Sequence, residues 1–134
     1  MALRNVKLTI AYDGTAYHGW QIQPAFASVQ GEITDVLKSI FGDDARICAA
    51  SRTDSGVHAL GQVGIIEIDS PIPTENLPKM LTDKLPPDIA IVDAEDVRRG
   101  MDIIGEVTNK QYRYSICTAR QRPVLKIRHC WHRP

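Results

Sequence analysis

The sequence lacks any hydrophobic run long enough to cross a membrane, because its uncharged apolar stretches fall far short of the ~18 residues that a transmembrane helix needs. It also lacks internal repeats, low-complexity segments and a secretory hydrophobic region before its first strand-like segment. Its 3 cysteines are an odd number without Cys-x-x-Cys spacing, which fits free thiols better than a disulfide framework. We therefore expect a soluble cytoplasmic protein whose 134 residues form one compact domain or slightly more.

The sequence has no net charge, but its charges are unevenly distributed. Residues 1–97 carry 7 Lys/Arg and 14 Asp/Glu, a net charge of −7, whereas residues 98–134 carry 9 Lys/Arg and 2 Asp/Glu, a net charge of +7. Such an asymmetry indicates an anionic partner near the basic end. The alternative is a solvated basic face whose charges balance the acidic part of the chain.

Apolar periodicity predicts six elements in the order strand, helix, strand, strand, helix, strand. They span residues 5–12, 29–41 with Ser28 as the N-cap, 46–50, 61–68, 74–85 and 88–92. This order is typical of an α+β, ferredoxin-like (split βαβ) fold, with an α+β sandwich of another topology as the alternative.

Two further extended segments, Glu106–Thr118 and Ile127–His132, are predicted within the basic region. We expect residues 1–97 to form the ferredoxin-like domain and residues 98–134 to form a basic β-strand extension. Such an extension is hard to bury alone, so we expect it to need a C-terminal domain or a second subunit.

The loop Ala49–Ala59 holds the densest collection of reactive side chains. Asp54 precedes Ser55-Gly56, which is typical of an Asx-type turn. Arg52 lies two residues earlier, where a strand end would put its guanidinium beside the carboxylate and keep Asp54 ionised. The same Asp-Ser-Gly sequence occurs in aspartic proteases, but a neighbouring arginine disfavours the shared proton which that chemistry needs.

Histidines and aromatic residues offer two other kinds of site. The sets His129, Cys130 and His132, or His18 and His58, lack the paired spacing of a structural zinc site, so no metal site is predicted. Tyr112 lies between Lys110 and Arg113, and an aromatic ring beside cations suits stacking on a base and neutralising a phosphate. A strand with one buried face is the alternative reading of this segment.

Five motifs occur in a fixed order along the chain. They are Tyr12-Asp13-Gly14-Thr15-x-Tyr17-His18-Gly19-Trp20-Gln21, Ser28-Val29-Gln30-Gly31, Ser51-Arg52-Thr53-Asp54-Ser55-Gly56-Val57-His58-Ala59-Leu60-Gly61-Gln62-Val63, Leu85-Pro86-Pro87-Asp88-Ile89 and Lys110-Gln111-Tyr112-Arg113-Tyr114. Together they closely resemble the tRNA pseudouridine synthase A family, from Leu8 to Trp131. Members of this family run to roughly twice this length, so the resemblance covers an N-terminal half and implies a C-terminal domain absent from this chain.

The resemblance implies isomerisation of uridine to pseudouridine in the anticodon stem-loop of tRNA, at positions 38, 39 and 40, by a homodimer without metal or cofactor. It implies that Asp54 is the catalytic aspartate, that Tyr112 stacks on the target base, and that Arg52 occupies the space of the extruded nucleotide. A cation that follows the flipped base into the stack compensates for the cost of flipping.

This sequence departs from the family pattern at two places within the matching region. Met101-Asp102-Ile103-Ile104 stands where Phe-His-Ala-Arg is usual, and Thr82 stands where asparagine is favoured. Neither change touches Asp54, Arg52 or Tyr112. The alternatives to an enzyme are a non-catalytic RNA-binding domain of the same fold and an inactive half that supports a partner.

Overall fold

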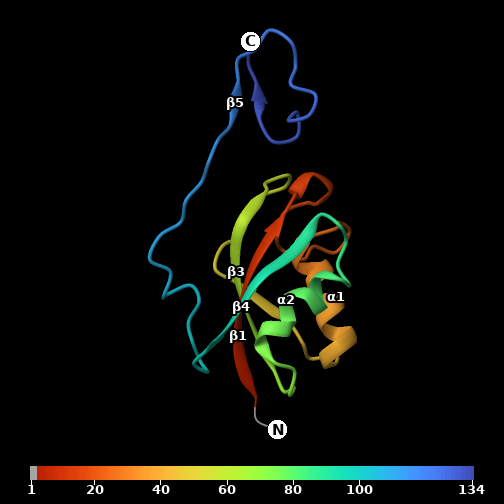
Figure 1. The fold of residues 1–134 in the computed structure, drawn as a ribbon, viewed down its shortest axis with the longest axis vertical. Helices are drawn as coiled ribbons and strands as arrows, with labels where there is room; N and C mark the ends of the chain where they lie inside the picture. The colour runs from red at the N-terminus through yellow and green to blue at the C-terminus, as the bar shows by residue number, and fades with distance from the viewer. Residues whose placement is uncertain (1–2) are drawn as a thin grey trace.

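The computed structural model describes residues 3–134. The N-terminal body contains a four-stranded sheet and two α-helices, and residues 98–134 form an arm that extends from it (Figure 1). The elements, in chain order, are β1 Arg4–Tyr12, the 3₁₀ helix η1 Gly14–Ala16, α1 Val29–Phe41, β2 Ile47–Ala49, β3 Ala59–Ile68, the 3₁₀ helix η2 Thr74–Asn76, α2 Leu77–Thr82, β4 Ile89–Val97, β5 Ile116–Cys117 and β6 Trp131–His132. The body is therefore of the α+β class.

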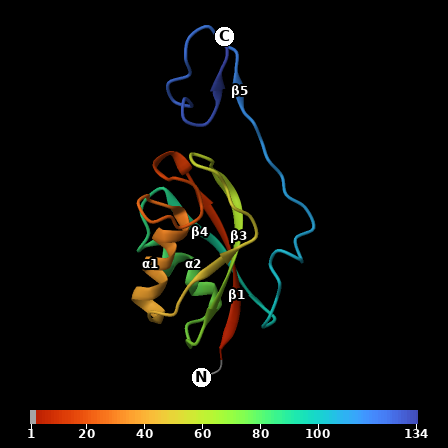
Figure 2. The same ribbon diagram turned by 180° about the vertical axis from the view of Figure 1, so that it is seen from behind.

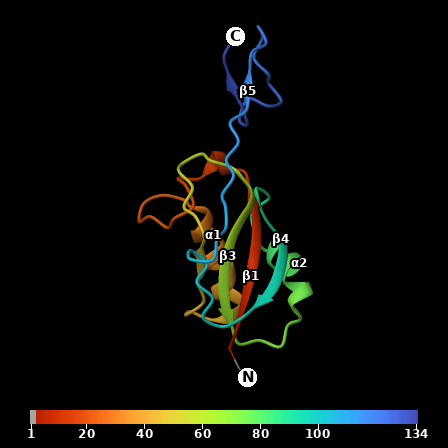
Figure 3. The ribbon, with the colours of Figure 1, turned by 90° about the vertical axis from the view of Figure 1, so that its left-hand side faces the viewer.

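The sheet has the strand order β2-β3-β1-β4, and every neighbouring pair is antiparallel. β1 is central, and its alternation puts Val6, Leu8, Ile10 and Tyr12 in the core, each at most 4% exposed. Both helices lie against one face of the sheet (Figure 3). The alternating pattern predicted for residues 5–12 is confirmed.

Helix α1 forms where the apolar stripe predicts it. The Ser28 hydroxyl accepts a hydrogen bond from the Gly31 N–H at 3.0 Å, which is the predicted N-cap. The helix buries Val29, Ile33 and Leu37 against the sheet and ends at Gly42, whose φ of 103° suits only glycine. No helix within residues 3–134 is both long and apolar enough to span a membrane.

The second helix is shorter than the predicted 74–85. Its first turn is the 3₁₀ helix η2, and α2 ends at Thr82 because the next backbone bonds, Lys84 N–H to Leu81 and Leu85 N–H to Thr82, are tight i→i+3 turns. Strand β4 is longer than the predicted 88–92, since it pairs with β1 as far as Val97. Backbone pairing with β1 extends the strand over Asp93, Glu95 and Asp96, whose side chains are polar and exposed.

The two extended segments predicted in the arm form strands over only part of their lengths. Of Glu106–Thr118 and Ile127–His132, only β5 and β6 are strands, and they pair with each other in parallel. The arm leaves the sheet after β4 and returns alongside it to the end where β1 finishes (Figures 1 and 2). Within the described residues the arm pairs with neither edge of the four-stranded sheet, and most of its backbone is irregular.

Candidate active site

Residues 51–58 form an irregular loop between β2 and β3, and this loop carries Asp54 at the end of the sheet where β1 finishes. The backbone turns over Ser55-Gly56, with the Val57 N–H donating to the Asp54 carbonyl at 3.1 Å. Within residues 3–134 no side-chain hydrogen bond uses the Asp54 carboxylate, which is exposed. A backbone turn thus shapes the loop and leaves the carboxylate free for a ligand.

Three hydrogen bonds with the end of β1 and the segment after it hold this loop in place. The Trp20 N–H donates to the Thr53 carbonyl at 3.1 Å, the Gly56 N–H donates to the Tyr17 carbonyl at 3.2 Å, and the Tyr12 hydroxyl lies 2.7 Å from Thr53 Oγ1. These bonds lie on both sides of Asp54 in the sequence. They restrict where its carboxylate can move, as a reactive group on a loop requires.

A second contact ties the segment after β1 to the start of β4. The Tyr17 hydroxyl donates to Asp88 Oδ1 at 2.6 Å, and the Asp13 N–H donates to the Asp88 carbonyl at 2.9 Å. Burial of the phenol, followed by its hydrogen bond to the Asp88 carboxylate, raises the pKa of Tyr17. Burial likewise raises the pKa of Tyr12, so both phenols stay protonated at neutral pH.

Arg52 and Asp54 line one small cavity of about 280 Å³, together with His18 and Gln21. Both side chains are exposed, and no ion pair within the described part of the chain joins them. The predicted close pairing of these two residues is therefore absent, because the chain leaves the extended conformation after β2 and no longer puts residues i and i+2 on one face.

A larger groove of about 1390 Å³ lies between this loop and the arm. Arg52, Asp54 and Tyr112 all line it. The Tyr112 hydroxyl lies 3.2 Å from Ser51 Oγ, and its side chain is 61% exposed. The structure thus brings together the three site residues predicted from the sequence, with an aromatic ring available for stacking beside the loop.

The arm also carries positive charge, and its Lys110, Arg113 and Arg128 line this groove. Two of its cations are paired with acids, Arg98 with Glu106 and Arg99 with Glu67. The other seven are exposed and form no ion pair within residues 3–134: Lys110, Arg113, Arg120, Arg122, Lys126, Arg128 and Arg133. An exposed cationic arm beside a groove suits an anionic ligand of many phosphates.

The pairing of Tyr17 with Asp88 and of Tyr12 with Thr53 was not predicted from the sequence. All four residues belong to the motifs, but 71 and 41 positions separate the partners. Only the side-by-side placement of β1, β3 and β4 brings them into contact. The sequence motifs single out all four residues as candidates for the site, but they do not show which of these residues contact one another.

Comparison with known proteins identifies the family. A family model described as tRNA pseudouridine synthase matches residues 8–122. A tRNA pseudouridine synthase A of Caldicellulosiruptor saccharolyticus is 43% identical over 132 residues, which are 98% of this chain and 54% of that protein. One of Geotalea daltonii is 40% identical over 130 residues, 97% of this chain and 53% of that protein. The chain spans about half the length of these curated relatives, and it belongs to the tRNA pseudouridine synthase family, a family of isomerases.

Proposed function

We propose that this chain carries the catalytic aspartate of a tRNA pseudouridine synthase of the A type, with Asp54 in that role. The observation that carries the proposal is the shared groove, which Asp54, Arg52 and Tyr112 line together beside the cationic arm. The proposed substrate is uridine in the anticodon stem-loop of tRNA, at positions 38, 39 and 40.

The reaction needs a carboxylate at the glycosidic carbon of the target uridine. The N1–C1′ bond breaks, the uracil turns, and a C5–C1′ bond forms, while C5 loses a proton and N1 gains one. Asp54 serves this reaction either by attacking C1′ or by removing the C2′ proton to give a glycal. The absence of a competing hydrogen bond to its carboxylate within residues 3–134 supports both routes.

Arg52 and Tyr112 make the remaining proposed contacts. Extruding the nucleotide costs a few kcal/mol of stacking, and Arg52 enters the space that it leaves. Tyr112 stacks on the flipped uracil, and its 61% exposure supports this role because the ring is open to a base. The seven unpaired cations of the arm neutralise phosphates of the stem-loop.

The organisation of the molecule completes the proposal. We propose a ferredoxin-like domain over residues 1–97, supported by the strand order β2-β3-β1-β4, and a basic extension over residues 98–134 that leads to a C-terminal domain. The sparse packing of the arm supports a further domain or subunit that covers it. A cytoplasmic homodimer acting on tRNA is the assembly that we propose.

Tritium release from tRNA labelled at uridine C5 tests the catalytic role. We expect release by the parent chain, and a loss on the order of 10³-fold or more in Asp54→Ala, because no other carboxylate of this loop can replace it. Asp43→Ala is the matched control, since Asp43 is equally exposed but lies beyond α1, and it should release tritium like the parent.

Binding of the same tRNA, measured at low salt, separates catalysis from recognition. Asp54→Ala should bind as tightly as the parent or more tightly, because a carboxylate repels phosphates. No release by the parent, with binding retained, would contradict an active chain and favour the RNA-binding domain. Loss of binding in Asp54→Ala would contradict the catalytic assignment.

A further inference from the structure

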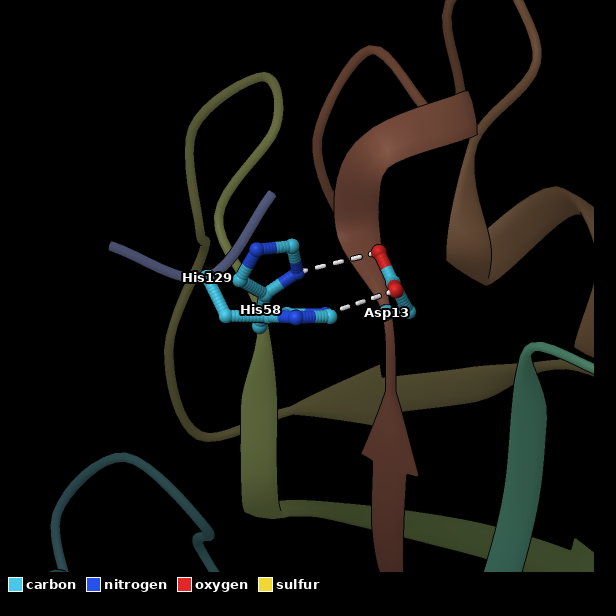
Figure 4. Close-up of side chains that lie close together, drawn as sticks. All are labelled: Asp13, His58 and His129. Carbon is cyan, nitrogen blue, oxygen red and sulfur yellow. Dashed lines mark hydrogen bonds and ion pairs between the residues drawn. The ribbon is translucent and has the colours of Figure 1, made fainter. Parts of the chain in front are cut away.

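The end of the groove beside η1 holds three side chains that join the arm to the body (Figure 4). Asp13 caps η1, His58 directly precedes β3, and His129 belongs to the arm. The Asp13 Oδ2 atom lies 2.9 Å from His129 Nε2, and the centroids of the two imidazole rings lie 4.7 Å apart. Three segments that are distant in the sequence therefore meet at one end of the groove.

Both ring nitrogens of His58 have a hydrogen-bond partner, one in the arm and the other in the body. Its Nε2 lies 2.6 Å from the Arg128 carbonyl oxygen, which only accepts, so Nε2 carries the proton and donates it to the arm. Its unprotonated Nδ1 accepts from the Gly14 N–H of the body at 2.9 Å. His58 is therefore neutral in this arrangement, and it bridges η1 and the arm.

The carboxylate of Asp13 makes a second bridge through its two oxygen atoms. Oδ1 accepts from the Thr15 N–H at 3.0 Å and from the Thr15 hydroxyl at 2.6 Å, and Oδ2 accepts from His129 Nε2. The hydrogen bonds from Thr15, with a smaller contribution from His129, hold the pKa of Asp13 well below its usual range. Asp13 is therefore ionised at neutral pH, with one oxygen fixed by η1 and the other bound to the arm.

Few other contacts hold the far part of the arm, residues 113–134, on the body. Within the described part of the chain, the bonds of His58 to Arg128 and of Asp13 to His129 are the only hydrogen bonds or ion pairs between the two. Apolar burial contributes little, since Val124 and Leu125 are 69% and 93% exposed. Residues 128–131 nevertheless line the groove, so the two bonds decide whether the far part of the arm forms its wall.

We propose that these three side chains form a latch, which docks the far part of the arm and positions Arg128 at the groove to meet a phosphate of a bound nucleic acid. The Arg128 carbonyl accepts from His58, and the next residue, His129, is bound to Asp13. Two bonds on neighbouring residues fix how this stretch of chain approaches the groove. The three side chains of the latch are positioning residues, and the Arg128 guanidinium is the group that touches the phosphate. The phosphate contact rests on the proposed function, whereas the latch itself does not.

NMR of the chain without RNA tests the latch. The Arg128 carbonyl protects the His58 Nε2 proton only while the arm is docked, so exchange of this proton with water reports undocking. We expect exchange to be at least about 10-fold faster in His129→Ala, because a hydrogen bond to a charged group is lost. His129→Gln should restore the parent rate, since its amide places an N–H donor near the position of Nε2. Lys126→Ala, in the same exposed turn, is the control and should exchange like the parent.

Asp13→Ser separates the latch from the cap of η1. A serine hydroxyl still caps the Thr15 N–H, but the second oxygen, which accepts from His129, is gone. The double variant Asp13→Ser/His129→Ala should exchange no faster than the faster single variant, because both substitutions remove the same bond. Equal exchange in the parent and His129→Ala, or effects that add in the double variant, would overturn the latch.

Binding of tRNA over a range of salt concentrations tests the phosphate contact separately. Arg128→Ala should reduce the slope of log affinity against log salt by about 1, the effect of one lost phosphate contact. His129→Ala should give the same reduction and His129→Gln should not, because only the alanine variant lets Arg128 leave the groove. An unchanged slope in Arg128→Ala would overturn the phosphate contact. Absence of tRNA binding by the parent would contradict the proposed function and this contact with it, whereas exchange of the His58 proton alone decides the latch.

Discussion

Gly19 lies where the segment after β1 closely approaches the Asp54 loop, and replacing it by alanine tests whether that approach positions the loop. Gly19 has a φ of 85°, and a Cβ added to it would lie 2.7 Å from the Thr53 carbonyl oxygen. Ordinary contact begins at 3.4 Å, so the carbonyl oxygen would have to retreat by about 0.7 Å. The Trp20 N–H donates to this oxygen at 3.1 Å, so the retreat would also stretch that bond.

Two free-energy terms add in Gly19→Ala. The left-handed backbone costs an alanine about 1–2 kcal/mol relative to glycine. The forced contact with Thr53 adds about 1–3 kcal/mol, as extra atoms in packed regions do. Gly56→Ala is the matched control, because Gly56 has a φ of 79° but nothing lies within 4 Å of its added Cβ. The difference between the two variants therefore isolates the contact between the segments.

Urea unfolding followed by circular dichroism measures this difference. For a slope of about 2 kcal/mol per molar urea, a 2 kcal/mol difference places the midpoint of Gly19→Ala about 1 M below that of Gly56→Ala. If the tritium-release activity proposed for this family member is present, it should also fall further in Gly19→Ala than the unfolded fraction explains. Equal midpoints for the two variants would refute the reasoning, because the loop would then yield without cost.

Two further predictions concern the supports of the site. Tyr17→Phe should lower stability by about 1–2 kcal/mol at pH 7, because it removes the 2.6 Å bond to Asp88. Because the pKa of Tyr17 is raised in the folded state, its contribution to stability is full below about pH 10, the pKa in the unfolded chain, and is lost as the pH rises further. The urea midpoint should therefore fall less between pH 8 and 11 in Tyr17→Phe than in the parent. Tyr114→Phe, at a 91% exposed position, is the control and should follow the parent. Ser28→Ala should lower the free energy of unfolding by about 1 kcal/mol, because it removes the N-cap of α1. Thermal unfolding measures this loss, with Ser39→Ala on the exposed face of the helix as the control. Equal melting temperatures for the two variants would contradict the role of the cap.

Much of the body could be predicted because its signals are local. The alternation of Val6, Leu8 and Ile10 reports a strand with one buried face, and the stripe from Val29 to Phe41 reports a helix of known length. The early end of the second helix at Thr82 and the far half of β4 were not predicted. In both places, close turns or pairing with a neighbouring strand outweighed the side-chain pattern.

The arm shows the limit of such patterns. Tyr112, Tyr114 and Ile116 alternate as a strand does, but only the two-residue β5 forms there, since a strand also needs a neighbouring strand to pair with. The predicted pairing of Arg52 with Asp54 failed for a related reason. The spacing i, i+2 puts two residues on one face only while the chain stays extended.

The sequence by itself determined the family, the core strand and helix, and the identity of Asp54, Arg52 and Tyr112 as site candidates, because motifs and periodicity are properties of neighbouring residues. Only the tertiary structure decided which distant residues meet. Tyr17 reaches Asp88 across 71 positions, and His129 reaches Asp13 across 116. Such contacts depend on the order of the strands and on the path of the arm, and no local pattern in the chain encodes the distance between two segments that folding brings together.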